Sequence, residues 1–383
     1  NGYIEALEHA VNQRPDLAIA TYRKILDEHP CDMFVHRLAQ QELFNFGRMN
    51  DMYEVAEKAA PHWTPEMTNY PIFLANRAFA NEETLHYEEA ERYGRASIEL
   101  DPSDPWGAHA VAHVLVMQGR IDDGVKWLEG LCGNWAGKNQ IVHHNWWHLC
   151  LFLLERGEHE RILELFDAEV YNLQSPLIQA MPDNVIDVTN VAALLLRLEL
   201  RGVDVGERWQ VVLEPAEGRI GNHAHPFTSA HAAIILAACG RFEQADELVR
   251  SMTEFAASDD GPYGECTRKA ALPAAKAAAE FGVGIVKSSV ATPDIEEAAE
   301  KSGADLIFQL YVRGDDAWIY EHLKRVEAAG YVGFCLTVDS AQYGRRERDK
   351  VKGFRPTQRS RVSGVNYQAA LDWGVVERLR TQT

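Results

Sequence analysis

The spacing of apolar residues changes at one place in the sequence, the segment 272–289. Before it, apolar residues recur at the three- and four-residue intervals that place them on one face of an α-helix. After it, short runs rich in β-branched residues alternate with helical segments. Two periodicities in succession indicate two domains of different fold class, and we place them at residues 1–275 and 276–383.

Charge is distributed unevenly between these two parts. The 383 residues carry a net charge of −19; residues after 282 contain 15 Lys and Arg against 14 Asp and Glu, so the first 282 residues carry −20. This acidity disfavours nucleic acid and anionic membranes as partners. No apolar run reaches the roughly 18 residues of a membrane span. The six cysteines show no CxxC pair, which fits reduced thiols, and we expect a cytoplasmic protein.

A turn followed by an amphipathic helix recurs in the first 275 residues. The repeated phrases begin at Gly47, His86, Gly119, Gly157, Gly202 and Gly240, 33 to 45 residues apart. A polar turn before acidic residues and an amphipathic helix is the second half of a helix-turn-helix repeat. Asp32 and Asp104 follow helix-ending prolines and are expected to cap the next helices. This pattern is typical of degenerate tetratricopeptide repeats and predicts a mainly α solenoid of helical hairpins.

Five histidines are candidate ligands on the inner face of this solenoid: His109, His113, His144, His148 and His231. The first two are four residues apart, as are the next two, so each pair lies on one helix face. Converging faces could bind a metal or an anionic small ligand, with Asp187 as a carboxylate partner. The alternative is a set of hydrogen-bonded polar layers between packed helices. Because HExxH does not occur, no metal site is predicted.

Four segments of this part, in order, resemble the tetratricopeptide repeat protein 38 family: 60–65, 106–114, 144–148 and 205–210. The resemblance covers roughly residues 1–275. It implies an α-helical repeat protein without established enzymatic chemistry, and we expect an interaction scaffold that takes a protein or small molecule on its concave face. Proteins of that family extend past both ends of the match, so we expect this copy to be cut at both ends.

Strand-like runs at 285–288, 306–312 and 332–338, with helices at 293–302 and 317–329 between them, predict parallel βαβ units. The sequence pattern fits either a barrel or a doubly wound sheet. In either fold, chemistry gathers at the carboxyl ends of the strands. Polar residues stand at or after these ends: Ser288, Gln309, Tyr311, Thr337, Asp339 and Arg346. They could hold the edge of a flat heteroaromatic cofactor and a carboxylate or phosphate, or they are ordinary strand-end polar residues.

The same segments resemble the FMN-dependent α-hydroxy-acid dehydrogenase and oxidase family, which includes glycolate and lactate oxidases. The match covers about residues 276–380 and implies a partial (β/α)8 TIM barrel, about strands two to four, with FMN as cofactor. It implies that Ser288, Gln309 and Thr337 contact FMN. It also implies that Tyr311 and Arg346 hold the substrate and that Asp339 supports the catalytic histidine. These roles come from the resemblance alone.

The histidine that removes the substrate proton in that family has no counterpart in this sequence, and a base within reach of the proton is a requirement of the reaction. We therefore expect a scaffold that carries an incomplete, inactive flavoenzyme barrel. The alternatives are an FMN-dependent oxidoreductase of lactate or glycolate type whose missing half a partner supplies, and a chimeric join of two unrelated genes. Segment 274–282 suits both neighbouring folds, which is expected of such a join.

Overall fold

The structure is a computed structural model that describes residues 2–281, 285–288, 294–302, 306–312, 315–331, 333–337 and 378. The chain divides into two compact units, Asn1–Gly282 and Val283–Thr383. The described part is mainly helical, as predicted. None of its helices is both long enough and apolar enough to cross a membrane.

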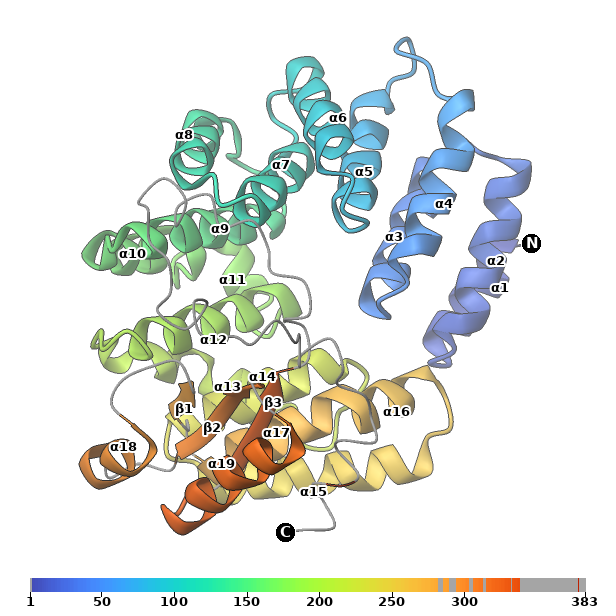
Figure 1. Cartoon of the computed structure of the whole chain (residues 1–383). Coiled ribbons are helices and arrows are strands. Elements are labelled where there is room, and N and C mark those ends of the chain that lie inside the picture. The colour runs from blue at the N-terminus through green and yellow to red at the C-terminus, as the bar shows by residue number, and fades with distance from the viewer. Residues whose placement is uncertain are drawn as a thin grey trace. The chain divides into compact units, whose positions relative to one another are not determined.

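Helices of the first unit pack mostly in consecutive pairs (Figure 1). The pairs are α1 (Gly2–Val11) with α2 (Pro15–Glu28), α3 (Met33–Asn45) with α4 (Met49–Ala59), α5 (Tyr70–Glu82) with α6 (Tyr87–Leu100), α7 (Pro105–Met117) with α8 (Ile121–Leu131), α9 (Ile141–Arg156) with α10 (His159–Leu165), and α14 (Pro226–Ala238) with α15 (Phe242–Ser258). Between them, α12 (Val185–Glu199) packs on η4 (Gly206–Val212), which leads into α13 (Leu213–Glu217).

Shorter helical segments and one last helix complete the unit. They are η1 (Ala60–His62), η2 (Cys132–Asn134), η3 (Phe166–Val170), α11 (Pro176–Ala180), α16 (Pro262–Cys266), η5 (Thr267–Ala271) and α17 (Leu272–Phe281). The sequence-based domain boundary falls inside α17, and this helix packs on α14 and α15 of the first unit.

The predicted turns and caps set the helix boundaries. Gly119 separates α7 from α8 with φ of +67°, a left-handed conformation that glycine adopts without strain. Asp32 and Asp104 cap α3 and α7, as predicted. The Asp104 carboxylate accepts hydrogen bonds from the backbone N–H groups of Trp106, at 3.0 Å, and Gly107, at 3.3 Å. These bonds satisfy donors that the first turn of a helix leaves unpaired.

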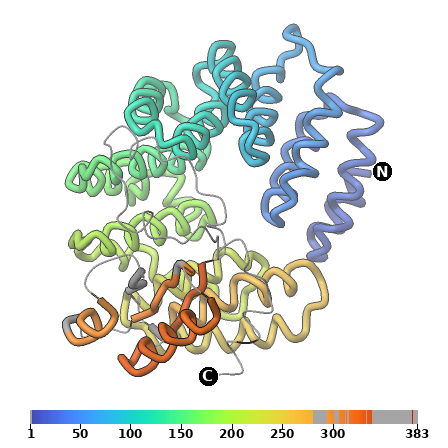
Figure 2. The backbone as a smooth tube through the Cα atoms, in the orientation of Figure 1, coloured from blue at the N-terminus to red at the C-terminus, as the bar shows by residue number. Residues whose placement is uncertain are grey.

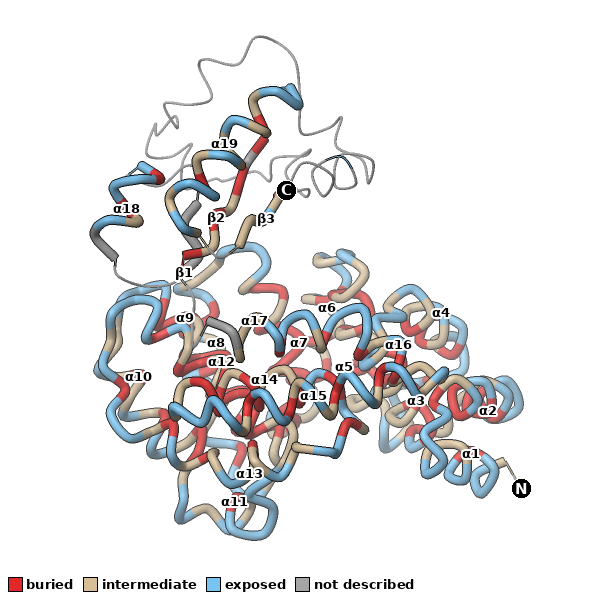
Figure 3. Tube along the Cα trace, turned by 90° about the horizontal axis from the view of Figure 1, so that it is seen from below, coloured by how far each residue is buried: buried red, intermediate tan, exposed pale blue. Residues whose placement is uncertain are grey.

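The first helices of successive pairs form a continuous inner layer. Helix α7 packs between α5 and α9, and α12 packs between α9 and α14. The tube in Figure 2 follows this layer around the arc, with the partner helices outside it. The largest core runs from α6 to α17 through side chains such as Phe152 and Leu194, and Figure 3 shows the buried residues on the sides where helices meet. The arc returns on itself where Phe46 contacts Tyr263, with ring centroids 5.1 Å apart.

The described part of the second unit is a parallel three-stranded sheet with two helices. Strands β1 (Ile285–Ser288), β2 (Leu306–Tyr311) and β3 (Gly333–Thr337) stand in that order, with α18 (Ile295–Ser302) and α19 (Asp316–Ala328) between them in the chain. These are the predicted βαβ units. Phe308 and Leu310 are buried in one cluster with Ile295 of α18 and Ile319 of α19. The helices therefore cover this face of β2. The predicted barrel would need more strands than these three, so the barrel stays a prediction.

The contact between α8 and α9 gives a test of how one helix pair packs on the next. Gly124 of α8 is buried, and a methyl group added to it would overlap the ring of Phe152 on α9. We expect Gly124→Ala to lower the free energy of unfolding by about 1–3 kcal/mol, because overpacking a core forces side chains from their rotamers. Urea unfolding followed by circular dichroism measures the change.

Gly130 supplies a matched control on the same helix. It is exposed, and nothing lies within 4 Å of an added methyl group. Gly130→Ala is expected to leave stability unchanged or to raise it by up to about 1 kcal/mol, since alanine is the better helix former. Equal effects at the two positions would contradict the packing of α8 on α9.

Candidate functional site

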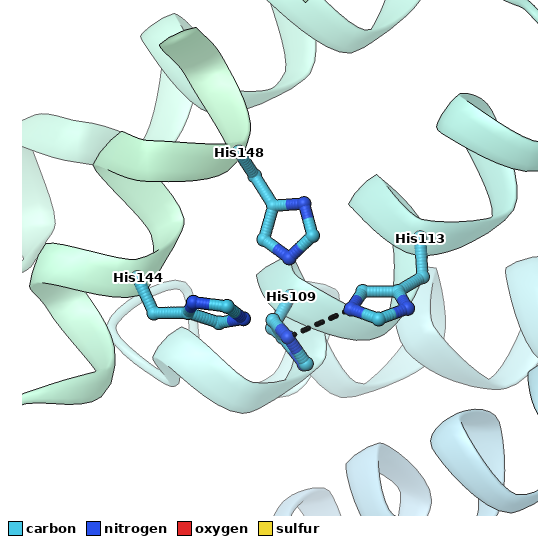
Figure 4. Close-up of side chains that lie close together, drawn as sticks. All are labelled: His109, His113, His144 and His148. Carbon is cyan, nitrogen blue, oxygen red and sulfur yellow. Dashed lines mark hydrogen bonds between the residues drawn. The ribbon is translucent and has the colours of Figure 1, made fainter. Parts of the chain in front are cut away.

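Four of the five predicted histidines come together between two neighbouring helices. His109 and His113 lie on one face of α7, and His144 and His148 lie on the facing side of α9 (Figure 4). Their ligand nitrogens all lie within 4.8 Å of one another. The Nε2 atoms of His109 and His113 are 3.0 Å apart. We call these four residues the histidine cluster.

Aromatic rings pack against the histidine cluster. Phe79 of α5 lies against His109, with ring centroids 5.3 Å apart, and Trp147 stacks on His144 at 5.0 Å. His109 and His148 are buried, while the side chain of His113 is 21% exposed. The cluster is therefore shielded from water on most sides and open to it at His113.

Two carboxylates and one amide contact the cluster from outside. The Nδ1 atom of His113 lies 3.4 Å from a carboxylate oxygen of Glu82 and 4.0 Å from one of Glu83. The Nδ1 atom of His144 is hydrogen-bonded to the side-chain oxygen of Asn190 at 2.7 Å. Sequence reasoning missed these three neighbours, because they belong to other helix pairs and no spacing links them to the histidines.

Burial controls the protonation of the cluster. It lowers the pKa of His144 to about 4 and the pKa values of His109 and His148 well below the ordinary value, with further lowering by neighbouring histidines. These three imidazoles are neutral at pH 7. Burial, followed by the charge of Glu82, raises the pKa of Glu83 to about 7.

The two other predicted residues of this site, Asp187 and His231, do not belong to the histidine cluster. Asp187 is hydrogen-bonded to His143, at 2.9 Å, and not to the cluster. In place of its expected role as a carboxylate partner of the cluster, Asp187 forms a buried pair with His143, next to the contact of His144 with Asn190 on the same helix α12. His231 lies on α14, and its Nδ1 atom is hydrogen-bonded to the Phe227 carbonyl at 2.9 Å. It is outside the cluster.

The second candidate site is the face of the sheet opposite to α18 and α19, which we call its uncovered face because neither of these two helices covers it. The strand register pairs Ser288 with Gln309, and Tyr311 with Thr337. Successive positions of a strand alternate between the two faces of a sheet. Gln309 and Tyr311 are two residues apart, so both positions lie on the side opposite to the buried Phe308 and Leu310. The polar strand-end positions thus share the face that α18 and α19 leave uncovered. Asp339 and Arg346 lie outside the described residues.

Thr337 is the most informative residue of this face. Its side chain is 8% exposed, and its hydroxyl makes no hydrogen bond within the described part of the chain. Buried hydroxyl groups are normally paired, because an unpaired one costs about 1–3 kcal/mol. The residue fits a ligand that accepts or donates a hydrogen bond at this strand end.

Known proteins are similar to this part of the chain. Residues 259–382 match the model of the FMN-dependent dehydrogenase family. The L-lactate oxidase of Nostoc sp. is 42% identical over 87 residues, which are 22% of this chain and 24% of that protein. The L-lactate dehydrogenase of Azorhizobium caulinodans is 35% identical over 120 residues, 30% of this chain and 32% of that protein. Glycolate oxidase 1 of Zea mays is 41% identical over 75 residues, 20% of each.

These matches define the C-terminal part as similar to a portion of an FMN-dependent hydroxy-acid dehydrogenase, and they imply FMN as its cofactor. The chain spans 20% to 32% of the length of the three relatives. The match begins at residue 259, so its first helices, α16 and α17, are ones that pack within the Asn1–Gly282 unit.

Among solved structures, the crystal structure of the APC/C hetero-tetramer Cut9-Hcn1 is similar over 71% of this chain and 55% of that chain, with a TM-score of 0.35 and 15% identity. At these values the likeness says nothing about function. The resemblance of residues 1–275 to the tetratricopeptide repeat protein 38 family stays a prediction.

Mutation can test the buried pair of His143 and Asp187 without changing the histidine cluster. Asp187 is fully buried, and its second oxygen makes no hydrogen bond among the described residues. We expect His143→Leu to lower the free energy of unfolding by about 3–5 kcal/mol, because it leaves a buried carboxyl group without its partner. Denaturant unfolding measures the loss.

The double variant His143→Leu with Asp187→Leu is the control. Because it removes both polar partners, part of the stability should return. A double variant that is as unstable as the sum of the two single variants would show that the pair is not coupled.

Proposed function

We propose that the Val283–Thr383 unit binds FMN on the uncovered face of its sheet, with a small 2-hydroxy acid as the substrate class of the site. The unpartnered hydroxyl of Thr337, in register with Tyr311, is the observation that carries this proposal. The family match and the lactate- and glycolate-oxidising relatives support it. A bound FMN would supply the two-electron acceptor for oxidation of such a substrate.

The residues of this chain have separate roles in the proposal. Ser288, Gln309 and Thr337 would hydrogen-bond the flavin from three adjacent strands. Tyr311 and Arg346 would hold the substrate, whose carboxylate suits an arginine fork. Asp339 would orient a histidine base.

Turnover would depend on that histidine base. His322 is the one histidine after residue 282. It lies on α19, its Nδ1 atom is 2.9 Å from the carbonyl oxygen of Trp318, and its helix covers the opposite face of the sheet. We therefore propose FMN binding as the function of this unit by itself. Substrate oxidation would need a base from outside residues 283–383.

For the Asn1–Gly282 unit we propose a scaffold role, in which the inner helix layer binds a protein or a small molecule. The continuous layer from α5 to α17 supports this role, because stacked helix pairs present an extended surface. We also propose a cytoplasmic location. The free state of all six cysteines supports it.

The flavin proposal is tested with the full chain and added FMN. We expect a yellow protein with one FMN per chain that does not bleach with L-lactate or glycolate. Thr337→Val should weaken FMN binding about three- to tenfold, which corresponds to the loss of one hydrogen bond. It should not lower the stability of the FMN-free protein, because the hydroxyl has no hydrogen-bond partner among the described residues. Flavin fluorescence quenching gives the affinity, and thermal unfolding gives the stability.

Thr253→Val is the matched control. Thr253 is exposed on α15, where its hydroxyl donates to the Val249 carbonyl, and the substitution should not change FMN affinity. A colourless protein that takes up no FMN would overturn the proposal, as would equal affinity of the Thr337→Val variant and the unchanged protein. Bleaching by either hydroxy acid would show that a base is present after all.

A further inference from the structure

The histidine cluster has buried nitrogens without partners. Both ring nitrogens of His148 and the Nδ1 atom of His109 are buried and make no hydrogen bond within the part of the chain that the structure describes. A neutral imidazole has one donor and one acceptor nitrogen, and leaving a buried polar group unpaired costs about 1–3 kcal/mol. Three such atoms on two rings of one cluster indicate that a group other than the protein pairs with at least one nitrogen of these rings.

The outer contacts show which nitrogens face inward. With the side-chain oxygen of Asn190 beside it, Nδ1 of His144 carries the proton, so the lone pair is on Nε2. A carboxylate oxygen of Glu82 lies 3.4 Å from Nδ1 of His113, close enough for charge attraction but without a hydrogen bond among the described residues. A carboxylate or amide behind an imidazole, on the nitrogen away from the ligand, is the usual arrangement around histidine ligands of metals.

We propose that the histidine cluster binds a divalent transition-metal ion of the zinc class through one nitrogen of each imidazole. Four nitrogens at about 2.0–2.1 Å from a tetrahedral zinc ion lie about 3.3–3.4 Å from one another. The nitrogens of the cluster already lie within 4.8 Å, and those of His109 and His113 are 3.0 Å apart. Small rotations of the rings would therefore complete the shell.

Helix geometry supplies the shell without strain. Residues four apart on a helix share one face, so α7 and α9 each present two imidazoles to the same space. The Asp104 cap and the contacts of α7 with α5 and α9 fix the facing helices. The partly exposed His113 gives the ion a path from solvent.

Charge selects a cation over an anion at this place. Glu82 and Glu83 are the carboxylates nearest to His113. The basic group on the other side, Arg37, stacks on Trp106 at 3.7 Å and donates to Asn76 at 2.6 Å. Its charge also reaches His109, where burial and the neighbouring histidines lower the pKa and Arg37 lowers it further. Neutral imidazoles with carboxylates behind them are metal ligands and poor hosts for an anion.

A purely structural polar layer would look different. His36, buried near the first pairs, is hydrogen-bonded through Nε2 to the Pro30 carbonyl at 3.0 Å, and His143 is paired with Asp187. Each of these histidines has a protein partner. His148 has none among the described residues, although it is as well buried as they are.

The experiment uses the tag-free full chain, treated with a chelator and then given Zn²⁺. We expect one Zn²⁺ per chain to remain after desalting, measured by mass spectrometry of the metal, and a rise in Tm on addition of Zn²⁺. Co²⁺ in place of Zn²⁺ should give the visible absorption of a tetrahedral site. His148→Gln and His113→Gln should each weaken Zn²⁺ binding at least about tenfold and abolish the Zn²⁺-dependent rise in Tm.

His62→Gln is the control, because His62 is exposed and far from the cluster in sequence; it should bind Zn²⁺ as the unchanged protein does. Far-UV circular dichroism establishes that each variant is folded, and His113, the partly exposed member, gives a variant in which loss of fold is least expected. An unchanged protein that retains neither Zn²⁺ nor Co²⁺ would overturn the proposal. Variants of His148 and His113 that are folded and bind Zn²⁺ as tightly as the unchanged protein would overturn it equally.

Discussion

Stacking of helix pairs is the interaction on which the N-terminal unit depends. A single pair cannot bury its apolar faces, so the inner helices α5, α7, α9, α12 and α14 must each be covered by the next. Burial this complete forces every polar group between two inner helices to find a partner or to bind something else. The candidate histidine site is therefore a consequence of the same packing that holds the solenoid together.

Local sequence patterns were sufficient to predict the helices and the shared faces of the histidines. Helical spacing, the Gly119 turn and the Asp104 cap act within a few residues, and a four-residue interval places two side chains on one face wherever the helix packs. Which faces meet depends on the rotation of each pair relative to the next. No local pattern records that rotation, and for this reason Glu82 and Asn190 escaped prediction and Asp187, expected as a carboxylate partner of the converging faces, pairs with His143 instead.

In the sheet of the second unit, too, local patterns predict which residues share a face, while the pairing of the strands depends on several segments together. Alternation along β2 predicted that Gln309 and Tyr311 share a face, and burial of Phe308 and Leu310 under the helices agrees with it. The strand register, which brings Thr337 beside Tyr311, is a property of three segments together. Segment 272–281 is compatible with both parts in the sequence: the structure builds it into the first unit, and the family match assigns it to the second.

Several unpaired buried polar atoms in one place are stronger evidence for a binding site than a single one. Single unpaired atoms, such as the Nε1 atom of Trp135, can be tolerated at a cost of about 1–3 kcal/mol. The cluster combines three nitrogens that are unpaired within the described residues, two neighbouring carboxylates and a partly exposed edge, and burial keeps His109, His144 and His148 neutral. Packing alone gives no reason to bring one nitrogen from each of four imidazoles within 4.8 Å of one another, since their mutual contacts cannot all be hydrogen bonds. A cation at that point would bind one nitrogen of each imidazole at once.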